Sequence, residues 1–187
     1  RAIIQDEGSQ LVVEALLAVP VSPPESAWLD MCAGPGGKAA VLASHARTQG
    51  VDFVAVELHA HRTALVESLL SAGASDSSDV APHILTADAC DRPWGSQFFD
   101  RILLDAPCTG LGALRRRPES RWRRNREDVS ELTSLQRRLL ATGLSSVRSG
   151  GVLAYVTCSP HIAETIDVVE EVLLHIDDVQ VLDAREL

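Results

Sequence analysis

Residues 27–38 read AWLDMCAGPGGK, an apolar run that ends in an acid and leads into a glycine-rich turn. The run is typical of a buried strand, and the glycines at positions 34, 36 and 37 let the backbone turn sharply and approach a ligand closely. A helical pattern over residues 38–48 follows, and the free N–H groups at its start would face that turn. The glycine spacing matches neither the dinucleotide-binding GxGxxG nor the phosphate-binding GxxxxGKS/T pattern. The turn alone therefore names no ligand.

The same alternation of apolar runs and amphipathic stretches continues along the chain. Strands are predicted over residues 27–32, 52–58, 83–87, 99–105, 151–157 and 179–182. Helices are predicted over residues 9–18, 38–48, 60–72, 129–147 and 163–176. Asp128 and Glu131 have the spacing of a capping box at the start of the fourth helix. Strands that alternate with helices indicate an α/β fold, a doubly wound and mostly parallel sheet, in which ligands bind outside the carboxyl ends of the strands.

Composition places the chain among ordinary globular proteins. It has 187 residues, of which 45% are hydrophobic and 23% charged, which excludes a disordered, collagen-like or coiled-coil chain and fits one domain over residues 1–187. No apolar run approaches the ~20 residues of a membrane helix, so we expect a cytoplasmic protein without a membrane partner. The four cysteines form no CxxC pair and the six histidines lack ligand spacing, so we expect no metal.

Charge is unevenly distributed. The net charge is −9, yet residues 115–126 contain seven arginines and only one acid, Glu119. A basic segment on an acidic body is typical of proteins that bind a polyanion such as RNA. A solvated, salt-bridged surface loop is the alternative interpretation.

Each of the first four predicted strands has an acid close to its carboxyl end. Asp30, Glu57, Asp88 and Asp105 follow in this order along the chain. An acid about twenty residues past the glycine turn suits the hydroxyls of a ribose, and the carboxylate of Asp88 suits an adenine amino group. The combined negative field favours a cationic ligand that carries a nucleoside, so a sulfonium cofactor fits better than a pyrophosphate. Each acid taken alone is more often a cap or a turn residue.

Two cysteines and the chain's single lysine complete the candidate site. Cys108 and Cys158 follow the fourth and fifth predicted strands, so that neighbouring strands would bring both thiols to one cleft. A thiol beside a lysine or a helix N-terminus becomes a nucleophile, whereas Cys32 and Cys90 fit the role of small buried apolar residues. Lys38 lies in the glycine turn, where it either takes part in the chemistry or only neutralises Asp30 or Asp105.

These segments resemble the RNA 5-methylcytosine methyltransferase family, in particular its bacterial branch that acts on small-subunit ribosomal RNA. The resemblance rests on residues 5–9 (QDEGS), 30–38 (DMCAGPGGK), 105–110 (DAPCTG) with 115–122 (RRRPESRW) after it, and 155–159 (YVTCS) with Glu164 and Thr165. It implies a class I methyltransferase fold and S-adenosylmethionine as the cofactor. The cofactor-binding residues that it implies are Cys32, Ala33, Gly34, Pro35, Gly36, Gly37, Lys38, Glu57, Asp88 and Asp105.

The resemblance also implies a catalytic sequence and an RNA-binding segment. Cys158 would attack the base, Cys108 would help to release the product, Asp105 would hold the base edge and Lys38 would polarise the ring. The Thr-Cys-Ser sequence favours RNA, since DNA enzymes attack with the cysteine of Pro-Cys. The residues expected to contact RNA are Arg115, Arg116, Arg117, Arg121, Trp122, Arg123 and Arg124. Trp122 either stacks on a base or anchors its loop to the core.

Full-length members of this branch carry an N-terminal RNA-binding domain, so the chain is interpreted as a catalytic-core fragment. The resemblance also implies a monomer. Two other interpretations remain open at this point. One is a non-catalytic RNA-binding or assembly module on the same fold. The other is a nicotinamide-dependent dehydrogenase, which rests only on the glycine turn and Glu57 and leaves both cysteine motifs unexplained.

Overall fold

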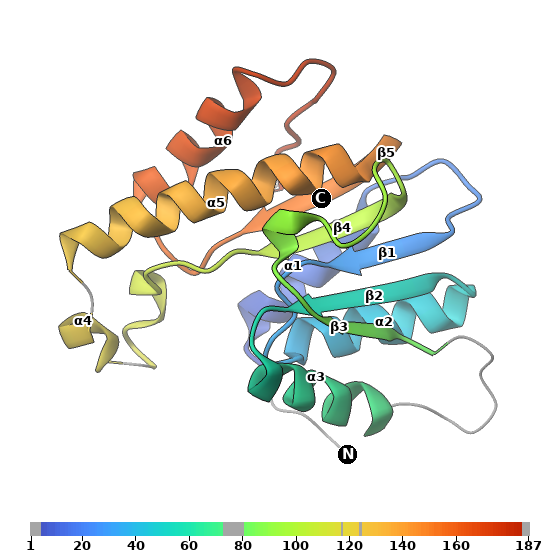
Figure 1. The fold of residues 1–187 in the computed structure, drawn as a ribbon, viewed down its shortest axis with the longest axis horizontal. Coiled ribbons are helices and arrows are strands. Elements are labelled where there is room, and N and C mark those ends of the chain that lie inside the picture. The colour runs from blue at the N-terminus through green and yellow to red at the C-terminus, as the bar shows by residue number, and fades with distance from the viewer. Residues whose placement is uncertain (1–4, 73–80, 117, 124, 185–187) are drawn as a thin grey trace.

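The computed structural model describes residues 5–72, 81–116, 118–123 and 125–184, and it contains one five-stranded sheet (Figure 1). All neighbouring strands are parallel, in the order β3-β2-β1-β4-β5. The strands are β1 (Ala27–Asp30), β2 (Asp52–Glu57), β3 (His83–Thr86), β4 (Phe99–Asp105) and β5 (Val147–Val156). The α-helices are α1 (Glu7–Ala18), α2 (Gly37–Gln49), α3 (Ala60–Ala72), α4 (Ser120–Arg123), α5 (Arg126–Ser146) and α6 (Ile166–Leu173). Short 3₁₀ helices are η1 (Ala89–Asp91), η2 (Leu111–Ala113) and η3 (Ile162–Glu164). The predicted doubly wound α/β fold is confirmed.

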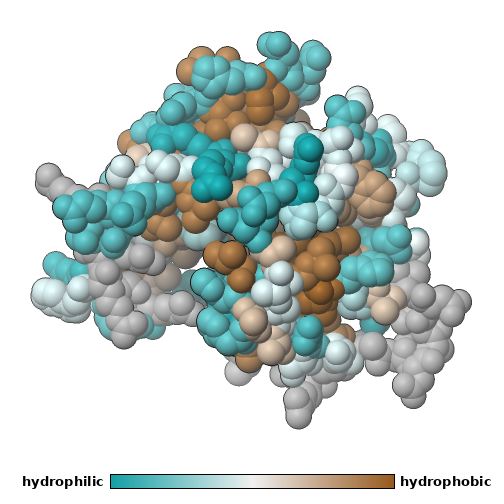
Figure 2. Space-filling view, in the orientation of Figure 1, coloured by the Kyte–Doolittle hydropathy of each residue, from teal (hydrophilic) through white to brown (hydrophobic). Residues whose placement is uncertain are grey.

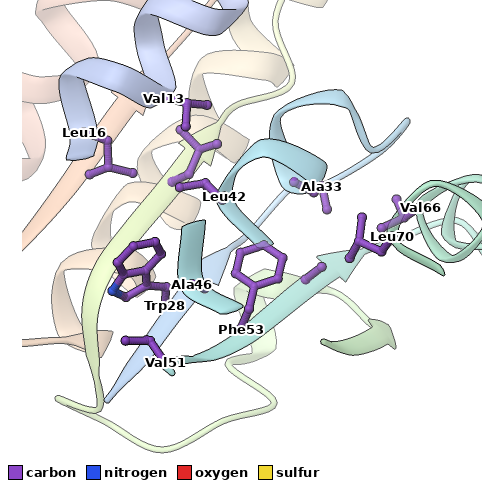
Figure 3. Packing of buried hydrophobic residues seen from close by; sticks show 13 residues of the cluster. Val13, Leu16, Trp28, Ala33, Leu42, Ala46, Val51, Phe53, Val66 and Leu70 are labelled. Atoms are coloured by element: carbon purple, nitrogen blue, oxygen red, sulfur yellow. The ribbon is translucent and has the colours of Figure 1, made fainter. Parts of the chain in front are cut away.

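Helices cover both faces of the sheet, with α5 and α6 on one side and α2 and α3 on the other (Figure 1). Successive side chains of a strand point to opposite faces, so Trp28 packs into the cluster under α1, α2 and α3, while Leu29 joins the cluster under α5 and α6. Figure 3 shows the first cluster, where Trp28 and Phe53 lie beside Leu42. Burial on both faces explains why β1, β2 and β4 read as nearly continuous apolar runs.

The connections between the strands determine where the sheet can bind a ligand. The chain runs outward from β1 through β2 to β3, then crosses back to β4 on the other side of β1 and ends the sheet at β5. The strand order therefore reverses between β1 and β4, and a crevice forms at such a point outside the carboxyl ends of the strands. Among the described residues, no helix combines the length and apolar character needed to span a bilayer.

The predicted sixth strand is wrong. Residues 179–182 are described and form no strand, and their apolar side chains stay largely in solvent, with Val181 65% exposed. The predicted helix over residues 163–176 is also divided, because η3 precedes a shorter α6 and the two are separated at Thr165. Apolar surface lies over α6 at the top of Figure 2. The apolar residues at 179–182 are thus exposed among the described residues, whereas Val168 and Val172 of α6 are buried in the core.

The start of α5 also differs from the prediction. Asn125 is the N-cap, its side chain accepts the N–H of Asp128, and the Asp128 carboxylate accepts the N–H of Asn125. The capping box is therefore Asn125 with Asp128, three residues earlier than Asp128 with Glu131.

Candidate active site

The four predicted acids lie at the same edge of the sheet. Asp30, Glu57 and Asp105 end β1, β2 and β4, and Asp88 caps η1 just after β3. Since β3, β2, β1 and β4 are neighbours in the sheet, their carboxyl ends form one continuous edge. Burial and the nearby Asp105 raise the pKa of Asp30 to about 7. The structure thus brings these acids together as predicted.

The glycine turn is packed tightly against Glu57. The N–H of Gly34 donates to Glu57 Oε2 at 3.1 Å, and a Cβ on Gly34 would lie 2.2 Å from that oxygen, so no side chain fits there. Gly36 has a φ of +112° at the N-cap of α2, which L-amino acids with side chains rarely adopt. Glu57 is 4% exposed and also accepts the N–H of His59 at 2.9 Å.

Arg62 from α3 is a neighbour of this turn that the sequence did not indicate. Its Nη2 donates to the carbonyl oxygen of Gly34 at 2.5 Å, and its Nη1 lies 3.5 Å from Glu57 Oε2. Its position five residues after Glu57, in the first turn of α3, is the only signal that the sequence carried.

Lys38 and Asp105 form an ion pair across the turn. Lys38 Nζ lies 2.6 Å from Asp105 Oδ2, and the two side chains are 17% and 31% exposed. Of the two acids that the sequence offered as its partner, the structure selects Asp105. The pair joins the α2 end of the glycine turn to the end of β4, directly before the Cys108 loop.

Cys108 and Cys158 meet at the ends of β4 and β5. Their sulfur atoms lie 3.3 Å apart, and Cys158 is exposed. The hydrogen bond from Cys108 lowers the pKa of Cys158 to about 6, although burial opposes this shift. The same hydrogen bond, together with burial, raises the pKa of Cys108 well above its usual range. These opposite shifts make Cys158 the sulfur that ionises first and Cys108 the thiol that donates to it.

The other two cysteines pack as predicted. Both are partly buried against the cluster under α5 and α6. Burial raises the pKa of Cys32 well above its usual value and raises that of Cys90 to about 11. Neither thiol is ionised at neutral pH, so only Cys158 has the character of a nucleophile. The described residues contain no group of three or more His, Cys, Asp or Glu that could hold a metal ion.

Backbone contacts hold the two cysteine loops against each other. The N–H of Ala106 donates to the carbonyl oxygen of Val156, and the N–H of Gly112 donates to that of Cys158, both at 2.9 Å. The first bond extends the β4–β5 pairing past the end of β4, and the second ties η2 to the loop that carries Cys158. Gly112 was not singled out by the sequence.

The basic segment lies partly within the described residues. Arg115, Arg116, Arg121 and Trp122 are exposed, while Arg117 and Arg124 fall outside the described residues, as does the side chain of Arg123. Trp122 is 86% exposed, with the Arg121 guanidinium 5.9 Å from its ring centre, so the expectation that Trp122 anchors the loop to the core is wrong. Arg116 forms an ion pair with Asp6, which lies just before α1.

A model of the family described as 16S rRNA methyltransferase RsmB/F matches residues 18–186. The chain belongs to this family. It is 47% identical over 189 residues to Rv1407, a provisionally named methyltransferase of Mycobacterium tuberculosis. The match covers 100% of the chain and 39% of that protein. It is 39% identical over 159 residues to ribosomal RNA small subunit methyltransferase B of Xanthomonas campestris, which covers 83% of the chain and 34% of that protein. The chain thus spans well under half the length of these relatives.

A solved structure extends the comparison. The chain is similar to NSun6 from Pyrococcus horikoshii, solved with SFG, at 26% identity and a TM-score of 0.74, over 91% of this chain and 41% of that one. The RsmB/F family and the class I methyltransferase fold identify S-adenosylmethionine as the cofactor.

The residues of this RsmB/F domain fit that cofactor. S-adenosylmethionine is a cation that offers ribose hydroxyl and adenine amino donors, and the edge that carries Glu57, Asp88 and Asp105 offers carboxylate acceptors, while Asp30 is buried. The turn over residues 34–37 brings backbone rather than side chains to that edge, and Gly34 and Gly36 have no room for a Cβ. The individual cofactor contacts of Cys32, Ala33, Pro35, Gly37 and the four acids stay predictions.

Proposed function

We propose that this domain transfers a methyl group from S-adenosylmethionine to carbon 5 of a cytosine in RNA, with ribosomal RNA as the substrate class. The observation that carries the proposal is the Cys108–Cys158 pair. The two sulfur atoms lie 3.3 Å apart and their pKa values are shifted in opposite directions, which fits an addition–elimination reaction with one nucleophile and one proton donor. The RsmB/F family supports the RNA substrate. SFG, an analogue of S-adenosylmethionine bound in the NSun6 structure, supports the cofactor.

The first step uses the Cys158 thiolate. Carbon 5 of cytosine is a poor nucleophile, and a bond from Cys158 Sγ to carbon 6 pushes electron density onto carbon 5. The bound cofactor supplies an electrophilic methyl group at its sulfonium. With a pKa of about 6, Cys158 is ionised at neutral pH without needing a separate base.

Release requires removal of the proton at carbon 5, after which the Cys158–carbon 6 bond breaks and its electron pair returns to sulfur. Cys108 fits both parts of this step. The hydrogen bond to Cys158 and its charge are among the causes that raise the pKa of Cys108. Once Cys158 is bonded to the base, those two causes disappear, so Cys108 loses its own proton to solvent more easily, and the resulting thiolate can take the proton from carbon 5. Protonated again, it donates a hydrogen bond to the departing thiolate.

Lys38 and Asp105 lie where they would orient the base. Asp105 precedes the Cys108 loop and Lys38 Nζ holds its carboxylate, so one amino donor of cytosine could bind Asp105 while the ammonium stabilises charge on the ring. Both side chains are partly exposed, as a residue that meets a substrate must be.

RNA binding belongs to the arginine segment in this proposal. The exposed Arg115, Arg116 and Arg121 would contact phosphates, and Trp122 would stack on an unpaired base. A base buried in a helix cannot reach Cys158, so the target cytosine must leave its stack. The proposal includes a cytoplasmic monomer without a catalytic metal, in which residues 1–187 form the catalytic domain beside an N-terminal RNA-binding domain.

Two substitutions test the proposal. Cys158→Ala should abolish methyl transfer to RNA, whereas Cys108→Ala should accumulate a covalent protein–RNA adduct that survives a denaturing gel. Cys90→Ala provides the matched control, since that thiol is partly buried against the cluster under α5 and α6 and should leave transfer intact. Undiminished transfer by Cys158→Ala would refute the nucleophile. A parent chain that binds RNA but transfers no methyl group would favour the non-catalytic module.

A further inference from the structure

A buried carboxylate lies directly behind the two cysteine loops. Glu164 ends η3, and it is 0% exposed. Its Oε1 accepts the N–H of Thr109 at 2.8 Å and Gln136 Nε2 at 3.1 Å, and its Oε2 accepts Thr109 Oγ1 at 2.5 Å. Burial opposes its ionisation, but hydrogen bonds from Ser159 and Thr109 outweigh burial and lower the pKa of Glu164. A charged side chain is thus held inside the domain by donors alone.

The donors come from the residues that flank the catalytic thiols. Thr109 follows Cys108 and Ser159 follows Cys158, and the two hydroxyl oxygens lie 3.1 Å apart. Gln136 from α5 donates to Glu164 and, through the same nitrogen, to the carbonyl oxygen of Pro107 at 2.7 Å. The residues on both sides of Cys108 and the residue after Cys158 are therefore linked through one carboxylate.

The chemistry of this position requires an acid. Backbone N–H groups and amide NH₂ groups only donate, and a carboxylate only accepts, so the donors from Thr109, Gln136 and Ser159 meet its two oxygens without a mismatch. A glutamine would keep the shape but direct an NH₂ group at one set of these donors. The buried carboxylate between η3 and α5 is consequently required as a hydrogen-bond acceptor and does not only occupy space.

We infer that Glu164 is a positioning residue that fixes the separation of the Cys108 and Cys158 sulfur atoms. The inference rests on the proposed function only for the use of the two thiols, since the contacts stand without it. Its consequence is that the hydrogen bond from Cys108, which keeps Cys158 ionised, depends on a side chain that touches neither sulfur atom.

The test measures the ionisation of Cys158 without RNA. The rate at which iodoacetamide alkylates Cys158 is followed across pH by mass spectrometry of the peptide that contains it, for the parent chain, Glu164→Gln, Thr109→Val and Thr109→Ser. Loss of the carboxylate or of the Thr109 hydroxyl should raise the pKa of Cys158, and each unit of that rise slows alkylation near pH 6 by up to about tenfold. Thr109→Ser keeps the hydroxyl and should behave as the parent. Glu170→Gln, the same chemical change at an exposed position of α6, should have no effect.

The opposite sign would overturn the inference. If Glu164 acted through its charge alone, removing that charge would ease ionisation of Cys158 and speed alkylation. An unchanged titration in a folded variant would show a structural role only. Thermal unfolding of each variant shows whether it is folded, and if Glu164→Gln unfolds, Thr109→Val decides, because it leaves the carboxylate and its backbone donor in place. Failure of the parent chain to methylate RNA would refute the proposed function and leave this titration readable.

Discussion

The backbone N–H of Gly112 donates to the carbonyl oxygen of Cys158 at 2.9 Å, and a Cβ on Gly112 would lie 2.8 Å from that same oxygen. Only glycine lets η2 approach the nucleophile loop this closely. We expect Gly112→Ala to shift the loop and reduce single-turnover methyl transfer by about tenfold or more, since that corresponds to only about 1.4 kcal/mol of the barrier. Gly95→Ala is the control, because a Cβ there meets nothing within 4 Å. Parent-like transfer by Gly112→Ala would contradict the close fit.

The separation of 3.3 Å between the Cys108 and Cys158 sulfur atoms predicts easy disulfide formation. With oxidised glutathione, the Cys158 thiolate attacks one sulfur and releases a glutathione thiolate, and Cys108 then displaces the second glutathione as it loses its proton. Titratable thiols should fall from four to two, methyl transfer should cease, and dithiothreitol should restore both. Cys158→Ser should instead keep its remaining thiols under the same conditions. Oxidation that links other cysteines would show that the pair is less accessible than its geometry indicates.

Asp30 predicts a stability that falls as the pH rises. Burial, with Asp105 nearby, raises the pKa of Asp30 from 3.8 to about 7. Stabilisation by the protonated form is complete below the unfolded value and is lost as pH rises through the folded value, on the order of 4 kcal/mol in total. Asp30→Asn keeps an oxygen for the N–H of Cys32 and removes the titration.

The measurement is the free energy of unfolding in urea at pH 4.5 and pH 8. These two conditions lie on either side of the folded pKa of Asp30. The parent chain should lose stability relative to Asp30→Asn between the two conditions. Asp52→Asn, an exposed change at the start of β2, should follow the parent. Equal slopes for the parent and Asp30→Asn would mean that Asp30 is ionised throughout.

Trp122 is a surface residue whose removal should affect RNA and not the fold. Because it is 86% exposed, Trp122→Ala should leave the unfolding temperature unchanged. Loss of one stacked base should weaken RNA binding by about 1–3 kcal/mol at fixed salt. Leu174→Ala, a change at a 79% exposed apolar residue after α6, tests whether any exposed apolar side chain would do the same. Equal RNA affinity of Trp122→Ala and the parent would assign binding to the arginines alone.

Most of the fold was readable from the sequence because buried parallel strands leave a strong pattern. All five strands of the sheet were predicted, and the rule that their carboxyl ends share one edge brought the acids and the two cysteines together. The same pattern failed over residues 179–182, where apolar residues alternate but remain exposed. A sequence pattern gives the hydrophobicity of a segment. Whether another element covers that segment depends on the tertiary structure, which the pattern does not give.

Features that depend on distant partners could not be predicted. Arg101 interrupts the apolar run of β4, yet it is buried, because its guanidinium pairs with Glu25 and donates to the carbonyl oxygens of Leu16 and Val19. Glu164 stood in the sequence only as part of a motif, and its burial follows from donors 28 and 55 residues away. The opposite pKa shifts of Cys108 and Cys158 likewise follow from a contact between side chains and not from either motif.

The ion pair between Lys38 and Asp105 has a practical consequence. Lys38 is the only lysine in the sequence, so amine-directed reagents have a single side-chain target here, and that target is next to the catalytic loops. Coupling a dye or a resin through lysine would modify the candidate active site, and acetylation would neutralise the ammonium that holds Asp105. For the same reason, the rate at which an amine reagent labels Lys38 would report whether a ligand covers the Lys38–Asp105 pair.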